Sequence, residues 1–571
     1  MKNILSTDPS PYLQQHKNNP VNWQTWSKKT LDLAQSQKKP ILLSIGYSSC
    51  HWCHVMAHES FEDKETADLM NKFFINIKVD REERPDVDFI FQSSFQLFNQ
   101  SSGGWPLTMF LDENGVPFMG GTYFPKFDQN GLPAFKTVLN KVFEAYNDQR
   151  LKIIQQKNLI IENLTIKKTN VINQQVEPIL ENILQNLDKK NGGYRGAPKF
   201  PTFYLFDTLM YFYNKTKSEK YLSPVETLLK NLCSKGIYDH VEGGIARYAV
   251  DEKWLVPHFE KMLYDNIQFV SLIANFLKIK KDVYYIKKVK QTTNFIINNF
   301  TSDENNLLGS AFDADSDGEE GKYYIFKFEE LKEIKNIDQY FDINPQGNWE
   351  GKIILNELKL ATADIINELL KIRKRRNKPF FDKKVQLDLN CMWVSALINL
   401  NSVLPNDNYL NLAENFFDRI EQKFCSDFIY HSYSKHISFI EDYAYLIKCL
   451  LDLFDNTMNP KYRILAKKYC EVAIEKFYDK DKKVFQKNEK INSDLFMNPI
   501  DISDNTISNG NSIMLINLTR LGFKHQAKEL CESINGYLNI YKNLMASSIK
   551  AVDFFKEIDN GKSCNQEGCK I

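Results

Sequence analysis

The sequence is poor in cysteine, has no charge excess and contains no long apolar run. Ten cysteines in 571 residues are too few for a secreted scaffold held together by disulfides. Lys and Arg number 73 and Asp and Glu 72, so the formal charge of +1 gives no electrostatic case for a nucleic-acid or membrane partner. No apolar run approaches the roughly 20 residues that span a bilayer, and Asp8 and Pro9 precede any run of signal-peptide length. We therefore expect a cytoplasmic protein with neither partner.

The aromatic residues are abundant, and the first part of the chain alternates between strand and helix patterns. Its 40 Phe and 27 Tyr provide enough apolar surface for a large core. Apolar runs at 40–46 and 75–80 predict buried strands, and a helix is expected to begin after Cys50 between them. Two further strands joined by the turn at 112–115 read as a hairpin. We predict an α/β domain over 1–165.

From about Lys167 the pattern changes to long amphipathic helices. About a dozen such segments follow, separated by long loops with Gly-Gly pairs or short hairpins. This arrangement favours a ring of helical hairpins over a compact four-helix bundle. We predict an all-α (α/α)6 toroid over 166–560, followed by a short tail at 561–571.

The clearest chemical motif is Cys50-His51-Trp52-Cys53-His54, placed where an apolar strand ends and a helix begins. Free N–H groups and the positive end of the helix dipole stabilise a thiolate there, and the two-residue spacing allows a disulfide. We predict that Cys50 is the exposed attacking thiol and that Cys53 is the more buried resolving thiol. His51, between them, can hold a proton or favour the thiolate.

Three other interpretations of this motif stay open. The Cys-x-x-Cys-His string is also the attachment pattern of haem c, which normally requires export and a remote axial ligand. A zinc site can combine Cys50 and Cys53 with His54 and His58, which are four residues apart on one helix face. The two cysteines can also be reduced thiols that have no catalytic or metal-binding role. Thiol redox chemistry needs no cofactor, so none is expected in that case.

A second element supports the redox interpretation. The stretch Gly103-Gly104-Trp105-Pro106 precedes the predicted strand at 107–111. A proline at that entry is a candidate for a cis peptide bond facing the cysteines. An ordinary trans proline that opens an edge strand is the alternative.

Several long stretches together resemble one known family. They are 19–23 (Asn-Pro-Val-Asn-Trp), 50–56 around the cysteine motif, 79–86 (Val-Asp-Arg-Glu-Glu-Arg-Pro-Asp), 103–106 and 120–125 (Gly-Gly-Thr-Tyr-Phe-Pro). On these motifs the chain resembles the spermatogenesis-associated thioredoxin-domain proteins over nearly its whole length. The resemblance implies a thioredoxin-like domain joined to a six-hairpin toroid similar to sugar epimerases and glycosidases. One position departs from ordinary thioredoxins, because Ser44 stands where they hold a buried acid that relays protons.

In the helical half, polar and titratable residues gather in loops beside Gly pairs, where a rigid scaffold usually carries its site. Pro257 is expected to open a helix from which His258, Lys261 and Asp265 project along one stripe. Acid, base and sugar-binding roles in a toroid cavity fit these groups, as does a purely structural hydrogen-bonded network. The cavity candidates are His240, Glu242, His258, Glu260, Asp265, Asp313, Asp315, Glu441, Asp442 and Asn509.

Cys564 and Cys569 form a second pair in the tail, and the resembled family ends in a similar pair. They can exchange electrons with Cys50 and Cys53, join them in a zinc site, or be inert. Three functions follow for the whole chain: thiol–disulfide exchange with a protein partner, an epimerase or glycosidase-like activity on a small sugar-like ligand, and a non-catalytic interaction role.

Overall fold

The computed structural model describes residues 1–571 except 130, 168, 170–174, 303–305, 426–427, 433–437, 490–493 and 562–571. The chain forms two compact units. The first comprises Met1–Lys167, His431–Phe439 and Gln486–Asp501, and the second comprises Lys168–Tyr430, Ile440–Phe485 and Ile502–Ile571. Cys564 and Cys569 of the predicted redox tail lie outside the described residues.

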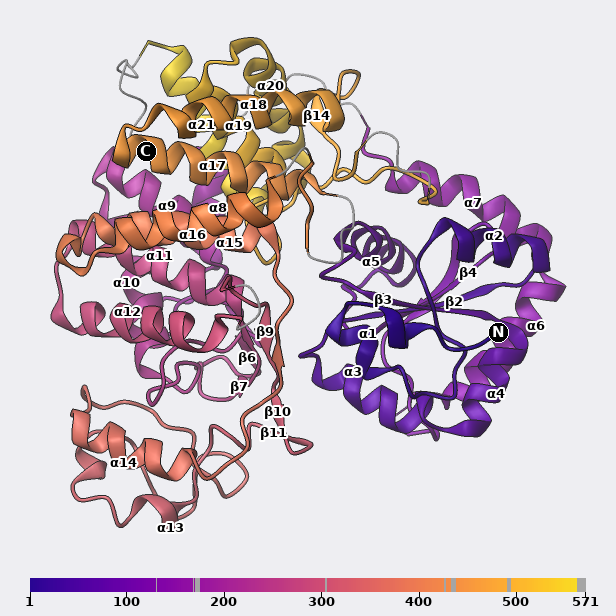
Figure 1. Cartoon of the computed structure of the whole chain (residues 1–571), viewed down its shortest axis with the longest axis horizontal. Coiled ribbons are helices and arrows are strands. Elements are labelled where there is room, and N and C mark those ends of the chain that lie inside the picture. The colour runs from indigo at the N-terminus through magenta and orange to yellow at the C-terminus, as the bar shows by residue number, and fades with distance from the viewer. Residues whose placement is uncertain are drawn as a thin grey trace. The chain divides into compact units, whose positions relative to one another are not determined.

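The described residues of the first unit form a five-stranded sheet with the order β1-β3-β2-β4-β5. Figure 1 labels β2, β3 and β4 of this sheet. Parallel pairing joins β2 to β3 and β3 to β1, whereas β4 runs antiparallel to both β2 and β5. The strands are β1 (Gln24–Thr25), β2 (Ile41–Gly46), β3 (Ile75–Asp80), β4 (Leu107–Leu111) and β5 (Pro117–Gly121). The four strands predicted from the apolar runs and the hairpin are confirmed.

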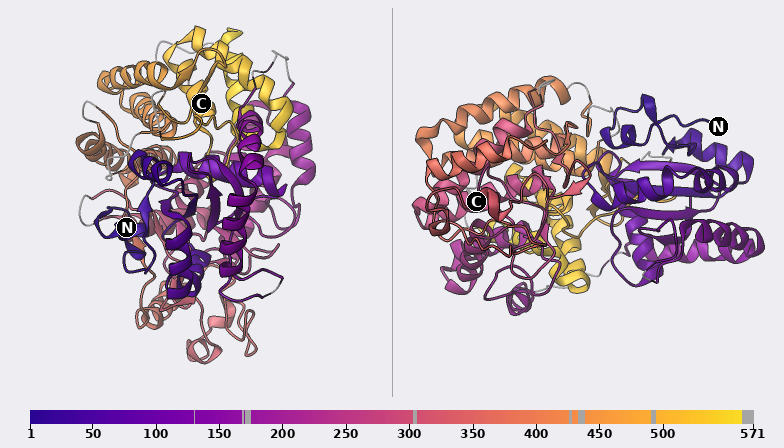
Figure 2. Two further views of the ribbon diagram at one scale, coloured as in Figure 1. Left: turned by 90° about the vertical axis from the view of Figure 1, so that its right-hand side faces the viewer. Right: turned by 90° about the horizontal axis from the view of Figure 1, so that it is seen from below.

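Helices cover both faces of this sheet (Figure 2). They are α1 (Pro11–Gln15), α2 (Lys28–Gln37), α3 (His51–Met56), α4 (Lys64–Phe73), α5 (Pro85–Asn99), α6 (Phe135–Asp148) and α7 (Arg150–Leu164). Because side chains alternate along a strand, Leu42 packs with α1, α3, α4 and α6 in one core. Leu43 and Ile77 pack with α2 and α5 in the other core. The cysteine motif begins α3 and therefore belongs to the first face.

Two segments that return from far along the sequence pack within the first unit and meet the stretch 79–86. Asn488 Nδ2 donates to Asp86 Oδ2 at 2.8 Å, and Arg84 forms an ion pair with Asp494 at 3.1 Å. The backbone oxygen of Glu82 accepts from His431 Nε2 at 2.7 Å. The stretch 79–86 therefore binds segments that come later in the chain, a role that its sequence alone does not reveal.

The second unit is a closed ring of helices, which confirms the predicted toroid. Among the described residues, six inner helices pack each against the next, and the last packs against the first. The inner helices are α9 (Phe203–Thr216), α11 (Leu263–Ile279), α15 (Leu387–Asn401), α17 (Ile440–Thr457), α19 (Gly510–Leu521) and α21 (Ala546–Asp559). The outer helices are α8 (Glu177–Asn186), α10 (Glu219–Ser234), α12 (Val283–Phe295), α16 (Tyr409–Phe424), α18 (Pro460–Phe477) and α20 (Lys524–Tyr541).

The connection between α12 and α15 carries a smaller satellite core. It holds the helices α13 (Phe328–Leu331) and α14 (Ala363–Arg373), whose apolar residues form a cluster of their own. Across the described part of the chain, no helix is long and apolar enough to cross a membrane.

Candidate functional site

Cys50 and Cys53 are joined by a disulfide at the start of α3, with their Cα atoms 5.2 Å apart. Cys50 is the N-cap of the helix, and its Sγ accepts from the backbone N–H of Cys53 at 3.2 Å. A sulfur in this position feels the free N–H groups of the first helical turn, which stabilise negative charge. The local geometry therefore suits a thiolate at Cys50 once the disulfide opens.

The prediction of an exposed Cys50 is wrong. Its exposed fraction is 3%, against 1% for Cys53, so both sulfurs are buried. The N-cap position directs the Cys50 side chain inward over the first turn, where it joins the apolar core of the first unit. Trp52 takes the exposed place instead, with 52% of its surface accessible and its ring 5.2 Å from that of Tyr123.

The Gly-Gly-Trp-Pro stretch carries the predicted cis bond, between Trp105 and Pro106. The Trp105 ring lies 5.8 Å from that of Tyr47, which precedes the cysteine motif, and Arg81 stacks over the Trp105 ring at 3.9 Å. Trp105 Nε1 donates to Asp88 Oδ1 at 2.9 Å. Burial raises the pKa of Asp88, which the positive charge of Arg81 opposes.

The three histidines of the motif lie differently. His51 is half-buried and its ring meets that of Trp52 at 5.7 Å, while His54 is also half-buried. His58 is exposed and its Nδ1 pairs with Glu62 at 3.1 Å. Because Cys50 and Cys53 are bonded to each other here, the zinc alternative requires the reduced state of the pair.

Sequence reasoning missed a buried lysine beneath the disulfide. Lys78 on β3 faces Ser44 on β2, and its Nζ donates to Ser44 Oγ at 3.0 Å. Three aromatic rings surround the ammonium group at 4.5 to 5.2 Å, those of Phe61, Tyr12 and Trp23. Burial lowers the pKa of Lys78 well below 10.5. The position that holds an acid in ordinary thioredoxins therefore carries a hydroxyl bonded to a buried cation.

The signal that could have identified this residue is the alternation within β3. Ile75, Ile77 and Val79 face the core with α5, so Asn76, Lys78 and Asp80 must face the cysteines. All six residues are buried. Three polar residues on one face of a fully buried strand indicate a buried polar site on the side of the sheet that faces the cysteines.

In the toroid, one group of predicted residues does come together. His258 Nδ1 lies 2.6 Å from Glu320 Oε1, and its Nε2 lies 3.6 Å from Glu260 Oε1. Arg247 contacts the same Glu260 oxygen at 3.0 Å. Burial, with Arg247 opposing and Glu260 assisting, raises the pKa of Asp265 well above 3.8.

The predicted helical stripe through His258, Lys261 and Asp265 is wrong. His258 lies in β7 (Pro257–His258), which pairs with β6 (Tyr248–Ala249), and Lys261 lies in β8 (Lys261–Met262), which pairs with β9 (Ala311–Phe312). Only Asp265 is helical, because α11 begins at Leu263. Cross-strand bonds override the helix signal of Pro257.

His240 and Glu242 belong to other buried networks. His240 Nδ1 lies 3.2 Å from Lys288 Nζ, and its Nε2 contacts the backbone oxygen of Lys235 at 3.1 Å. Glu242 accepts from Arg373 at 3.2 Å. Burial and the charge of Lys288 lower the pKa of His240 well below 6.5, so its ring stays neutral at physiological pH.

The remaining candidates are spread over the second unit. Asp313 Oδ1 accepts from the backbone N–H of Asp315 at 3.1 Å, and Asn509 caps α19 and donates to Asp504 Oδ1 at 2.9 Å. Glu441 and Asp442 occupy the first turn of α17.

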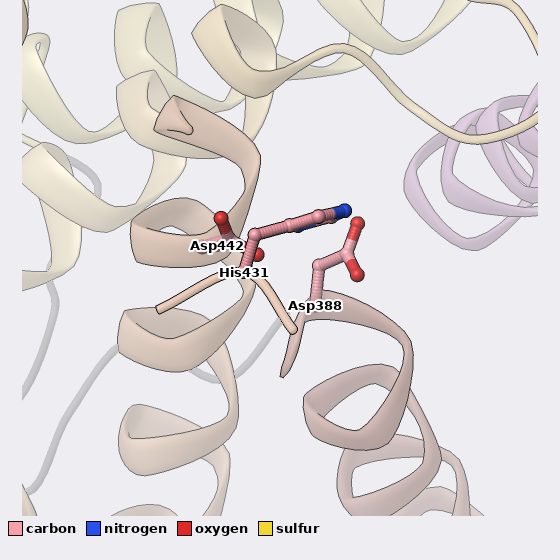
Figure 3. Close-up of side chains that lie close together, drawn as sticks. All are labelled: Asp388, His431 and Asp442. Carbon is pink, nitrogen blue, oxygen red and sulfur yellow. The ribbon is translucent and has the colours of Figure 1, made fainter. Parts of the chain in front are cut away.

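Figure 3 shows Asp442 beside Asp388 of α15, with carboxylate oxygens within 4.8 Å of each other. Both carboxylates come from the second unit and are buried. His431, the third residue labelled in Figure 3, belongs to the first unit.

The ring of inner helices encloses a cavity of about 500 Å³. Its lining is mixed in charge and includes Asp207, Lys278, Lys448, Asp452 and Arg520. None of the ten cavity candidates is among the described residues that line it. Their role in binding a ligand stays a prediction.

Comparisons with known proteins agree with the family resemblance. The family model Thioredox_DsbH, described as "Protein of unknown function, DUF255", matches residues 2–165. An uncharacterized protein of Caenorhabditis elegans is 31% identical over 604 residues, covering 94% of this chain and 82% of that protein. Spermatogenesis-associated protein 20 of Homo sapiens is 30% identical over 605 residues, covering 91% and 76%.

Two solved structures align with about two thirds of the chain at low sequence identity. A cellobiose 2-epimerase from Bacillus thermoamylovorans aligns with a TM-score of 0.45 at 14% identity, covering 67% of this chain and 98% of that one. A GH76 α-mannanase from Bacteroides thetaiotaomicron aligns with a TM-score of 0.38 at 12% identity, covering 67% and 81%.

Proposed function

The chain belongs to the spermatogenesis-associated protein 20 family, and from the geometry of its first unit we propose that it is a thiol–disulfide oxidoreductase acting through Cys50 and Cys53. The observation that carries the proposal is the disulfide at the N-cap of α3, at the end of a parallel strand in a thioredoxin-like domain. The proposed compartment is the cytoplasm, and no resident cofactor is needed.

The proposed reaction begins when a thiolate of a partner protein attacks Cys50 Sγ. A bond forms between the two sulfurs, the Cys50–Cys53 bond breaks, and its electron pair leaves on Cys53 as a thiolate. In the reverse direction, the Cys50 thiolate, stabilised by the N-terminal dipole of α3, attacks one sulfur of a partner disulfide and the other partner sulfur leaves as a thiolate. The Cys53 thiolate then attacks Cys50 Sγ, which re-forms the Cys50–Cys53 bond and releases the second partner thiolate. Because Cys50 is only 3% exposed, the exposed ring of Trp52, with the half-buried ring of Tyr123 beside it, is the proposed contact that brings a protein partner to it.

Alkylation of the intact chain, followed by mass spectrometry, tests this proposal. We expect dithiothreitol to expose two additional reactive thiols in the wild type, both mapped to the cysteine motif, and Cys50→Ser to abolish disulfide exchange with a protein substrate. Cys425→Ser is the matched control, because Cys425 is a partly exposed free cysteine of the toroid. If a chelator, and not a reductant, made the two wild-type thiols reactive, the zinc interpretation would replace the redox proposal.

A second candidate function is acid–base catalysis on a sugar in the toroid. Within the described part of the chain, the buried Oδ2 of Asp265 has no hydrogen-bond partner. A carboxyl group whose pKa is raised by burial keeps its proton to a higher pH, as a general acid requires, and His258 lies in the same cluster as Glu260. This pairing of an acid with a base is what an epimerase or glycosidase requires.

The two candidates separate cleanly. His258→Ala should abolish epimerisation or hydrolysis of a disaccharide and leave disulfide exchange intact, whereas Cys50→Ser should do the reverse. If neither variant alters any turnover while a protein partner remains bound, the non-catalytic interaction role is supported instead.

A further inference from the structure

The hydroxyl of Tyr12 lies beside the resolving sulfur, in a space left open by a glycine. A Cβ atom placed on Gly46 would stand 2.2 Å from Tyr12 Oη and 2.8 Å from Cys53 Sγ. The phenol oxygen and the sulfur therefore both border the space that a side chain at 46 would fill. Gly46 is the last residue of β2 and lies on the same face of the sheet as Ser44.

Tyr12 is held in this position by the short helix α1. Ser10 caps the helix, and its Oγ donates to Asp80 Oδ2 on β3 at 2.6 Å. The Tyr12 ring packs edge-on against His16 at 5.1 Å, and Lys78 Nζ lies over its face at 5.1 Å. The ring is completely buried. Its hydroxyl therefore has a fixed direction and no access to bulk water.

Within the described residues, Tyr12 Oη has no hydrogen-bond partner. A buried hydroxyl without a partner costs stability, and such groups are rare in folded proteins. A disulfide sulfur is a weak acceptor, whereas a thiolate is a strong, charged one. Opening the disulfide therefore creates a hydrogen-bond acceptor, the thiolate, for the Tyr12 hydroxyl.

The charged and titratable groups around Tyr12 keep it a donor. Burial, and after it the charge of Asp80, raise the pKa of Tyr12 well above 10.0, so the phenol stays protonated at physiological pH. Burial and the charge of Lys78 lower the pKa of His16 well below 6.5, so its ring is neutral. Lys78, the cation over the ring face, draws electron density from the ring and strengthens the O–H donor.

We propose that Tyr12 Oη donates a hydrogen bond to the Cys53 thiolate that leaves when a partner thiolate opens the disulfide. This inference rests on the proposed redox function. The partner sulfur bonds to Cys50, the electron pair of the broken bond stays on Cys53, and Tyr12 keeps its proton throughout. Tyr12 stabilises the leaving group and relays no proton.

The conservative variant Tyr12→Phe tests the inference in the full chain. In a Cys50→Ser background, the pH dependence of iodoacetamide alkylation at Cys53 reports the pKa of that thiol. Because a hydrogen bond to the charged form lowers a pKa, we expect Tyr12→Phe to raise it by about one unit. With both cysteines present, Tyr12→Phe should slow reduction by dithiothreitol roughly three- to tenfold, since the leaving thiol is more basic.

Two further variants complete the test. Tyr146→Phe is the matched control, because it removes a buried phenol that contacts Glu113 on another part of the first unit, and it should change neither quantity. Gly46→Ala places a methyl group between the phenol and the sulfur and should reproduce the loss with the hydroxyl still present. An unchanged Cys53 pKa and an unchanged reduction rate in Tyr12→Phe would overturn the inference, whereas a wild-type disulfide that dithiothreitol never reduces would overturn the proposed function.

Discussion

Lys78 of the first unit is compensated differently from the buried lysines of the second unit and from Arg84 and Lys487 of its own unit, which pair with Asp494 and Asp501. Among the described residues of the second unit, every buried lysine pairs with a carboxylate. The pairs are Lys199–Asp188 at 2.6 Å, Lys261–Asp239 at 2.7 Å, Lys288–Glu357 at 2.9 Å and Lys384–Asp382 at 3.2 Å. In the first unit, Lys78 donates to the hydroxyl of Ser44 and otherwise meets aromatic rings.

This difference indicates which buried charges hold the structure and which prepare a reaction. A buried pair compensates part of the lost hydration of both ions: burial lowers the pKa of Lys261 and Lys288, and the carboxylates of Asp239 and Glu357 oppose that shift. A buried cation beside a hydroxyl and aromatic rings is only partly compensated, and its pKa falls. Such a group lies where negative charge develops during the reaction, because Lys78 packs on Tyr12 and Tyr12 faces Cys53.

The largest effect is expected when a paired network in the toroid loses its shared anion. Asp239→Ala leaves Lys261 with the backbone oxygen of Gly243 and Arg373 with Glu242. An uncompensated buried charge costs about 3–5 kcal/mol, which denaturant unfolding would measure as a lowered free energy of unfolding.

Glu368→Ala is the control for this prediction, because it breaks an exposed pair with Lys371 and should cost less than about 0.5 kcal/mol. Equal losses in the two variants would show that burial does not decide the value of these pairs.

The next effect reverses its sign between the units. Lys78→Met removes a buried cation that has no carboxylate partner among the described residues, and it should stabilise the protein by about 1–3 kcal/mol, since the cost of burying the cation disappears. Lys288→Met removes the partner of Glu357 and should destabilise it. Thermal unfolding of both variants against the wild type measures the contrast, and stabilisation by both would remove the distinction between the units.

The pH dependence of Lys78 has a definite sign. Its folded-state pKa is lowered by burial, so the unfolded chain binds the proton more tightly. The stability penalty is fully present below the folded-state pKa and disappears as the pH rises from that pKa to 10.5. The stability of Lys78→Met, measured relative to the wild type across this range, should therefore decline as the pH rises.

Asp265 gives the opposite pH dependence in the toroid. Burial raises the folded-state pKa of Asp265, and the charge of Arg247 opposes this shift. The stability that Asp265 contributes is therefore fully present below pH 3.8, its ordinary pKa, and falls as the pH rises toward the folded-state pKa. Asp265→Asn should remove this slope, which is at most about 1.4 kcal/mol per pH unit. Unfolding curves from pH 4 to pH 8 measure it, with the exposed Asp418→Asn as a control that keeps the slope.

The sequence was sufficient for the local features of the first unit. The cysteine motif, the strand at 75–80 and the cis bond before Pro106 follow from short-range patterns, and the structure contains each of them. The same reasoning missed Tyr12 and Lys78, because their environment arises from the pairing of strands and from a helix 38 residues before Cys50.

Long-range packing also explains the errors. The segment 486–501 packs in the first unit through contacts such as that of Asn488 with Asp86, which are 402 positions apart and leave no periodic trace in the sequence. Residues 257–258 and 261–262 form strands of two residues each. A strand of two residues is too short to show an alternating pattern in the sequence. The burial of Cys50 likewise depends on the cap geometry and not on its neighbours in the sequence.

The smallest stability effect and the most selective functional effect are expected at Trp52. Because the ring is 52% exposed, Trp52→Ala should change the free energy of unfolding by less than about 0.5 kcal/mol. The rate of reduction by dithiothreitol should stay within about twofold of the wild-type rate, since a small thiol needs no docking surface. Exchange with a protein disulfide should show a raised KM, because an exposed aromatic side chain beside a reacting group is a typical anchor for a partner. Phe127→Ala, which removes a ring that is 68% exposed elsewhere in the first unit, is the matched control. An equal loss in both variants would mean that the surface around Cys50 does not select the partner, and that the buried polar groups beneath the disulfide are the part of the first unit that distinguishes it from the toroid.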